Sequence, residues 1–151
     1  MTFRDYFFSE ALVGEPFWLK HLGSGDKVKV QRVTGTPAFY GWEGNNEHAA
    51  IDVGIAPIID MLNQKGYKTW VSCSGLPEDH KPKEHTSLSN MIIGAYIGFD
   101  PKDYNVLRPI FIAAGFKEVG NRSAHVYPKS LLHLRNIWKN FFELVKRLPS
   151  K

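Results

Sequence analysis

Alternation of apolar and polar residues predicts the first strand of this chain. Val28 and Val30 alternate with lysines in the segment 27–33, which is the period-two pattern of a half-buried strand. The segment 68–73 is rich in β-branched and aromatic residues and predicts a second strand. The nearly continuous apolar run 91–99 predicts a central strand covered on both faces. A further strand, a turn and a last strand are expected within residues 116–127.

Three segments show the spacing and end signals of helices. The first is expected from about residue 54 to 65, with Pro57 in its first turn and Gly66 after its end. The second follows Asp100-Pro101, contains a kink at Pro109 and ends at Gly115. The third is a long amphipathic helix over residues 130–148. The Gly- and Asn-rich stretch 34–48 between the first strand and the first helix is read as a loop.

This order of elements predicts an α+β fold. Strand, helix, strand, strand, helix, strand is the order of the ferredoxin-like split βαβ sandwich, in which helices cover one face of an antiparallel sheet. We therefore expect a single domain over residues 1–151, with an N-terminal arm (1–26), a body of sheet and helices (27–128) and an added C-terminal helix (130–148). The alternative is another α+β arrangement, in which the sequence GTPAFYGW adds a strand.

Composition sets the class of protein. The chain has 151 residues, 43% of them hydrophobic, and one cysteine, so it forms no disulfide within itself. Without a signal-peptide pattern or a long apolar run, we expect a soluble cytoplasmic protein with no membrane partner. A net charge of +4 permits contact with nucleic acid without demanding it. The C-terminal helix carries an apolar stripe that must pack on the domain or on a second subunit, which would give a homo-oligomer.

The long polar segment after the second strand is the first candidate site. It begins with Ser72, Cys73, Ser74 and Gly75, small residues whose backbone N–H groups can converge on an anion. Lys68 precedes them on the same strand and supplies a positive charge. Ser72, Ser74, Gly75 and Lys68 are therefore predicted ligand-binding residues.

The same residues carry a resemblance. The run LNQKGYKTWVSCSG resembles a segment of small uncharacterised prokaryotic and phage proteins. Thr69 together with Ser72-Cys73-Ser74-Gly75 is also similar to the Thr-Ser-Ser-Cys-Ser-Gly-Arg segment of the wybutosine-synthesis tRNA methyltransferases. Leu76 stands where that family has arginine. The resemblance implies a binding role for the Ser-Cys-Ser-Gly residues alone.

Catalysis is the alternative use of this segment. Cys73 is a candidate nucleophile, with His80, His85 or His125 as its base. The pair Glu78-Asp79, and Asp79 in particular, is a candidate for general acid–base catalysis. His80 and His85 are candidate ligands of a metal such as zinc. No motif identifies a cofactor.

RNA recognition is a further reading of the central strand. Tyr96 or Phe99 would stack on bases there, but GAYIGF lacks the basic-Gly-aromatic signature of that module. Moreover, we expect the C-terminal helix to cover the face of the sheet that the other helices leave open. Two hypotheses follow: a binding domain for an anionic ligand, either a nucleotide or nucleic acid, near Ser72–Gly75, or a small enzyme that uses Cys73 or a metal.

Overall fold

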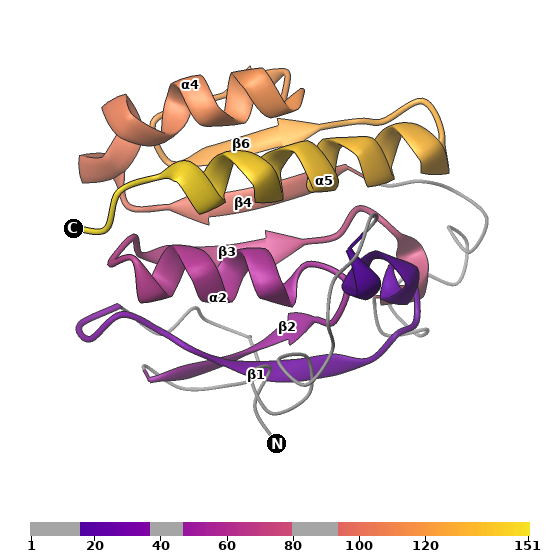
Figure 1. Ribbon diagram of the computed structural model, residues 1–151, viewed down its shortest axis with the longest axis horizontal. Helices are drawn as coiled ribbons and strands as arrows, with labels where there is room; N and C mark the ends of the chain where they lie inside the picture. The colour runs from indigo at the N-terminus through magenta and orange to yellow at the C-terminus, as the bar shows by residue number, and fades with distance from the viewer. Residues whose placement is uncertain (1–15, 37–46, 80–93) are drawn as a thin grey trace.

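The computed structural model describes residues 16–36, 47–79 and 94–151. Strands and helices are interspersed along these residues (Figure 1). The strands are β1 (Lys27–Gln31), β2 (His48–Asp52), β3 (Thr69–Cys73), β4 (Ala95–Phe99), β5 (Glu118–Val119) and β6 (Ser123–Val126). The α-helices are α2 (Ala56–Gln64), α4 (Tyr104–Ala114) and α5 (Leu131–Arg147), and short 3-10 helices are η1 (Phe17–His21), η2 (Pro77–Asp79) and η4 (Pro101–Asp103).

The helices begin and end where the sequence signals them. The Asp100 side chain accepts a hydrogen bond from the N–H of Lys102 at the start of η4, and Ser130 Oγ accepts one from the N–H of His133 at the start of α5. Gly115 ends α4 with φ of 115° and Gly66 follows α2 with φ of 94°, backbone angles that favour glycine. The local signals therefore hold in the folded chain.

The strands form two antiparallel sheets, which confirms a mixed α+β fold. β1 pairs with β2, and a four-stranded sheet has the order β3-β4-β6-β5. The predicted adjacency of the strands around residues 68–73 and 91–99 is confirmed by the antiparallel pairing of β3 with β4. The ferredoxin-like order is not confirmed. That order would place β1 in one sheet with the later strands, but in the described sheets β1 pairs only with β2.

β2 is a correction to the predicted elements. Residues 48–52 were assigned partly to a loop and otherwise to no element, yet they pair with β1 over its whole length, from Lys27 opposite Asp52 to Gln31 opposite His48. The sequence HAAID shows no clear alternation, and its burial rises along the strand instead. Its strand conformation therefore depends on pairing with β1. The alternative strand at GTPAFYGW falls mostly on residues 37–46, outside the described residues.

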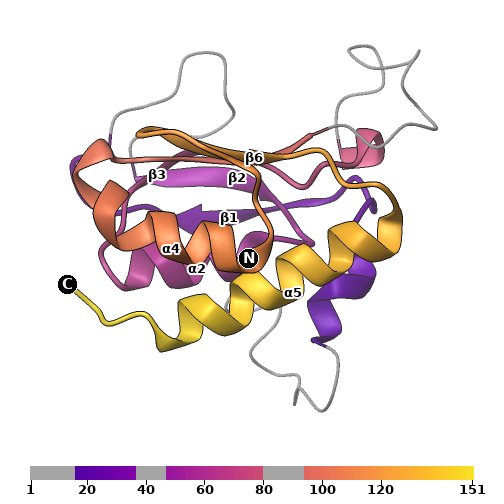
Figure 2. The ribbon, with the colours of Figure 1, turned by 90° about the horizontal axis from the view of Figure 1, so that it is seen from above.

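All three α-helices of the described chain lie on the same side of the strands (Figure 2). The expectation that the C-terminal helix covers the opposite face of the sheet is therefore wrong. α5 packs against α2 and α4 and buries its apolar stripe within this chain, at Leu134, Ile137, Trp138, Phe141, Phe142 and Val145. Since the single chain buries these residues, the stripe does not require a second subunit.

The described part of the N-terminal arm belongs to the core. Trp18 and Leu19 are each 1% exposed, and the Trp18 ring lies 5.1 Å from the ring of Phe142 on α5. These contacts hold residues 17–22 on the helical side of the domain. None of the helices in residues 16–36, 47–79 and 94–151 combines the length and apolarity needed to cross a bilayer.

Candidate functional site

The Ser-Cys-Ser-Gly segment forms a buried turn at the end of β3. Gly75 has φ of 97°, so the turn uses the backbone freedom of glycine. The N–H of Ser74 donates to Asp52 Oδ2 at 3.1 Å, and the N–H of Leu76 donates to Ser74 Oγ at 3.3 Å. The carbonyl of Ser74 accepts from Trp138 Nε1 at 2.9 Å. The turn thereby joins the ends of β2 and β3 to helix α5.

Asp79 binds this turn to the segment before β1. Its carboxylate accepts hydrogen bonds from the N–H groups of Gly23 and Gly25, at 3.1 and 3.0 Å, and from the hydroxyl of Ser74. Lys27 pairs with Asp52 and donates to the carbonyl of Asp79 at 3.0 Å. Asp79 and Asp52 are 3% and 6% exposed. Two buried carboxylates and one lysine therefore connect four segments of the chain.

These contacts change the interpretation of the predicted anion site. Two of the N–H groups on which that prediction depends have partners within the protein: that of Ser74 donates to Asp52 Oδ2 and that of Gly75 to Cys73. Ser72 is 4% exposed and Ser74 fully buried. The carboxylate of Asp52 occupies the position at Ser74 that an external anion would take. Binding of a ligand at Ser72–Gly75 stays a prediction, and these contacts give it no support.

Cys73 is buried beside the same turn. The pKa of its thiol is raised to about 12, chiefly by burial; the carboxylates of Asp52 and Asp79 add to the rise, and the N–H of Gly75 and the charge of Lys27 oppose it. The thiolate is the nucleophilic form of cysteine. At neutral pH this side chain is therefore a protonated thiol, 2% exposed.

The four-stranded sheet has one face toward the helices and one away from them. Ala95, Ile97 and Phe99 on β4 are fully buried in the hydrophobic core. Side chains alternate along a strand, so Tyr96 points to the other face. The register places Cys73 and His125 on either side of Tyr96, directly opposite it on β3 and β6. Directly opposed residues share a face, so these three side chains lie in a row across the sheet.

Tyr96 and His125 form an aromatic pair on this face. Their ring centroids are 5.4 Å apart with 30° between the planes. The hydroxyl of Ser123 lies 3.0 Å from His125 Nε2, which orients the imidazole ring. Both rings are partly exposed, and burial raises the pKa of the Tyr96 hydroxyl to about 12. The Tyr96 hydroxyl is therefore protonated at neutral pH, as a neutral donor and acceptor.

Two glycines, Gly98 on β4 and Gly94 just before β4, bring neighbouring side chains close to the sheet. A Cβ at Gly98 would lie 2.9 Å from Val71 Cγ1, and a Cβ at Gly94 would lie 2.7 Å from the Tyr127 ring. Tyr127 is 68% exposed. The face therefore presents three rings from β4, β6 and the residue after β6, which we call the aromatic face: Tyr96, His125 and Tyr127.

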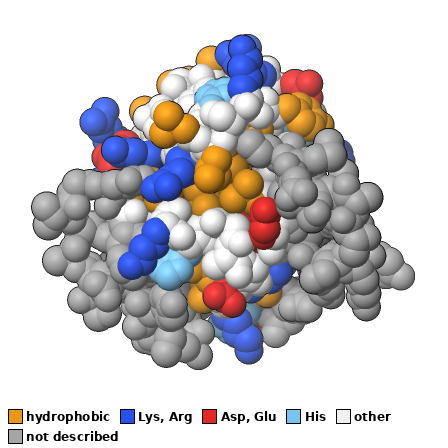
Figure 3. Space-filling view, turned by 90° about the vertical axis from the view of Figure 1, so that its right-hand side faces the viewer, with side chains coloured by type: hydrophobic (Ala, Val, Ile, Leu, Met, Phe, Trp, Pro, Cys, Tyr) orange, Lys and Arg blue, Asp and Glu red, His pale blue; other side chains and the backbone are white. Residues whose placement is uncertain are grey.

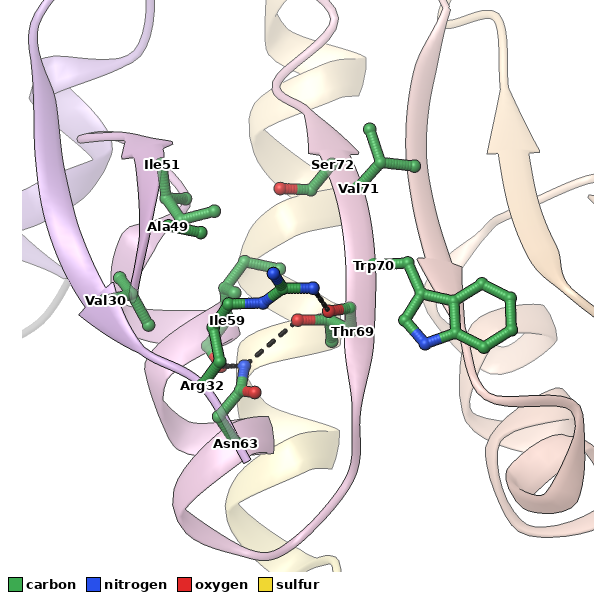
Figure 4. A pocket seen from close by; sticks show the side chains of 10 residues that line it. All are labelled: Val30, Arg32, Ala49, Ile51, Ile59, Asn63, Thr69, Trp70, Val71 and Ser72. Carbon is green, nitrogen blue, oxygen red and sulfur yellow. Dashed lines mark hydrogen bonds between the residues drawn. The ribbon is translucent and has the colours of Figure 1, made fainter. Parts of the chain in front are cut away.

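A small cavity lies between β2 and β3 (Figure 4). These two strands belong to different sheets, and no strand pairing joins them in the described residues. Its volume of about 10 Å³ is room for about one water molecule. Arg32 reaches across it and donates to the carbonyl of Thr69 at 3.4 Å, and Asn63 Nδ2 donates to Thr69 Oγ1 at 3.0 Å. On the lower side of the cavity, the first bond connects the residue after β1 to β3, and the second connects α2 to β3.

The predicted site residues are thus only partly brought together. Cys73 and His125 share a face with Tyr96 between them, whereas Asp79 lies in the hydrogen-bonded cluster with Ser74 and Lys27. His80 and His85 lie outside the described residues. Among the residues that are described, no three His, Cys, Asp or Glu side chains are grouped so as to hold a metal ion.

Tyr127 is the residue of the aromatic face that the sequence does not single out as functional. Tyr96 is named from the sequence as a base-stacking residue, and its position between Gly94 and Gly98 leaves its ring above small neighbours. Two expectations count against that reading: GAYIGF lacks the RNA-recognition signature, and the C-terminal helix is expected to cover the face. The fold defines the class of this protein as an α+β domain with all its described α-helices on one side. No protein-family model matches the chain, and no curated protein or solved structure shows significant similarity to it.

Proposed function

We propose that this chain is a nucleobase-binding domain, acting on a nucleotide or on single-stranded nucleic acid, and that bases stack on the aromatic face. The observation that carries the proposal is the Tyr96–His125 ring pair on adjacent strands, on the side of the sheet away from all three described α-helices (Figure 2). Aromatic side chains and histidine on an accessible sheet are a recurrent platform for bases, because every base has a π face.

Charge and exposure support the same ligand class. The chain carries a net charge of +4, which favours a polyanion over a neutral ligand. At the end of the molecule where β6 passes into α5, Lys and Arg side chains lie on one side of a group of hydrophobic side chains, and Asp or Glu side chains lie on the other (Figure 3). Tyr127, 68% exposed, follows β6 directly and extends the aromatic face toward this end. Positive charge beside exposed rings suits phosphate and base together.

This proposal keeps the ligand class expected from the sequence and places its contact elsewhere. In the Ser72–Gly75 turn the N–H groups of Ser74 and Gly75 donate to Asp52 and Cys73, while the aromatic face offers partly exposed rings. An enzyme that uses Cys73 finds no support in a buried thiol with a pKa of about 12. The alternative metal site at His80 and His85 stays a prediction.

Binding of fluorescein-labelled single-stranded RNA and DNA octamers, followed by fluorescence anisotropy, tests the proposal. Isothermal titration with the four ribonucleoside monophosphates separates nucleotide binding from nucleic-acid binding. Loss of one stacked base costs about 1–3 kcal/mol, so Tyr96→Ala should weaken the affinity about 5- to 150-fold. Titrations at two salt concentrations measure the phosphate contribution, which weakens steeply with salt.

Tyr96→Phe is the matched control, because it keeps the ring and removes only the hydroxyl. It should bind almost as the parent chain does, and His125→Ala should fall between the two. Circular dichroism verifies that each variant is folded. If no octamer or nucleotide binds saturably at low salt, or if Tyr96→Ala and Tyr96→Phe bind alike, the aromatic face is not a base platform.

A further inference from the structure

A cleft of about 490 Å³ lies at the end of the β1–β2 hairpin, two strands away from Tyr96. It is lined by residues from the end of β1, the turn after it and the start of β2. Pockets of about 300–1,000 Å³ are the size that holds small molecules. The residues that the argument uses are Arg32, Thr34, Thr36, Glu47 and His48.

One cationic side chain lines this cleft and a second lies beside its turn. Arg32 contributes a guanidinium that is fixed by its bond to the Thr69 carbonyl. Lys68 Nζ lies 3.8 Å from the position of a Cβ at Gly35, at the turn that lines the cleft. The lining includes one carboxylate, Glu47, whose residue is exposed to solvent and therefore screened.

The turn at residues 33–36 has a defined backbone conformation. The N–H of Thr36 donates to the carbonyl of Val33 at 3.1 Å, and Gly35 has φ of 85°, the backbone angle that a type II turn requires at its third residue. Asn63 Oδ1 accepts from the N–H of Val33 at 3.2 Å, which attaches the turn to α2. The exposed Thr34 is thereby held on a structured rim, whereas Thr36 is buried and its hydroxyl donates to the carbonyl of Val33 at 2.6 Å.

We propose that this cleft binds a small molecule bearing an oxyanion, a phosphate or a carboxylate group, through Arg32, Lys68 and Thr34. An arginine presents a fork of donors that matches both groups, and a lysine adds a compact charge. Within the described residues a metal is not the expected occupant, because one carboxylate and one imidazole fall short of a ligand set. The cleft is independent of the aromatic face.

Amide chemical shifts in ¹⁵N-labelled protein test the proposal with pyrophosphate and succinate as probes, in a buffer of constant ionic strength. We expect saturable shifts at the amides of Thr34, Gly35 and Thr36 with at least one probe, and the stronger probe identifies the oxyanion. Lys68→Met should weaken that binding about tenfold or more, because a charge-assisted hydrogen bond is lost. Arg32→Gln is the second variant, read together with its circular dichroism because Arg32 is buried.

Tyr96→Ala separates this proposal from the proposed function. It should bind the small probe as the parent chain does, even where it loses RNA or nucleotide binding. The proposal is overturned if neither probe shifts the three amides saturably, or if neither Lys68→Met nor folded Arg32→Gln changes the affinity.

Discussion

Asp79 should act as a structural residue whose loss destabilises the domain, and Asp79→Ala tests this. The substitution removes an acceptor shared by Gly23, Gly25 and Ser74. A hydrogen bond to a charged group contributes about 1.5–3 kcal/mol, and bonds that share one carboxylate do not add fully. The two glycines lie where water can replace the carboxylate, because Gly25 is exposed and Gly23 half-buried.

Ser74 determines how much stability the Asp79→Ala substitution costs. It is fully buried, so its hydroxyl loses the Asp79 acceptor without a solvent replacement. We therefore expect Asp79→Ala to lower the free energy of unfolding by about 2–4 kcal/mol. Asp79→Asn keeps the shape and one acceptor oxygen, and should cost about half as much.

Urea unfolding followed by tryptophan fluorescence measures both values by linear extrapolation. Glu78→Ala is the control, because Glu78 directly precedes Asp79 within η2 and is exposed. It should change the free energy of unfolding by less than about 0.5 kcal/mol. A loss below about 1 kcal/mol for Asp79→Ala would show that the carboxylate does not hold the segments together, and would reopen a functional role for Asp79.

The other predictions concern the same turn and the end of the chain. Cys73, with a pKa of about 12, should resist a thiol reagent at pH 8 until urea unfolds the protein, and rapid labelling of the native state would contradict this. Burial raises the pKa of Asp52 above its ordinary value, so stability should increase as pH falls from neutral toward the ordinary value of 3.8. Urea unfolding at several pH values should show that the free energy of unfolding changes less with pH in Asp52→Asn than in the parent chain. An equal pH dependence in the two proteins would refute this. Gly75→Ala should cost about 1–2 kcal/mol of stability by the same assay, because φ of 97° is unfavourable for alanine, and an unchanged midpoint argues against the turn geometry. Lys65→Met should lower the melting temperature, since Lys65 Nζ donates to three carbonyl groups at the end of α5, whereas an unaltered melting curve would show that this cap is dispensable.

Local chemistry determined most of the elements of this fold in advance. Asp100, Ser130 and Gly115 act within one turn of the helix ends that they define, so their roles can be predicted from neighbouring residues alone. The alternation in β1 and the apolar run of β4 reflect burial that repeats along a strand. These features depend on contacts that are near in sequence, and they were predicted correctly as to type.

Long-range contacts decided what the local pattern left open. β2 depends on pairing with β1, and the position of α5 depends on its packing against α2 and α4. Whether Ser74 offers its N–H to a ligand was settled by Asp52, a residue 22 positions earlier in the chain. The row of Cys73, Tyr96 and His125 arises only from strand register. Residue types indicate which chemistry a chain can perform, but register and helix placement decide which side chains meet, because those contacts join segments whose separation in sequence carries no local signal.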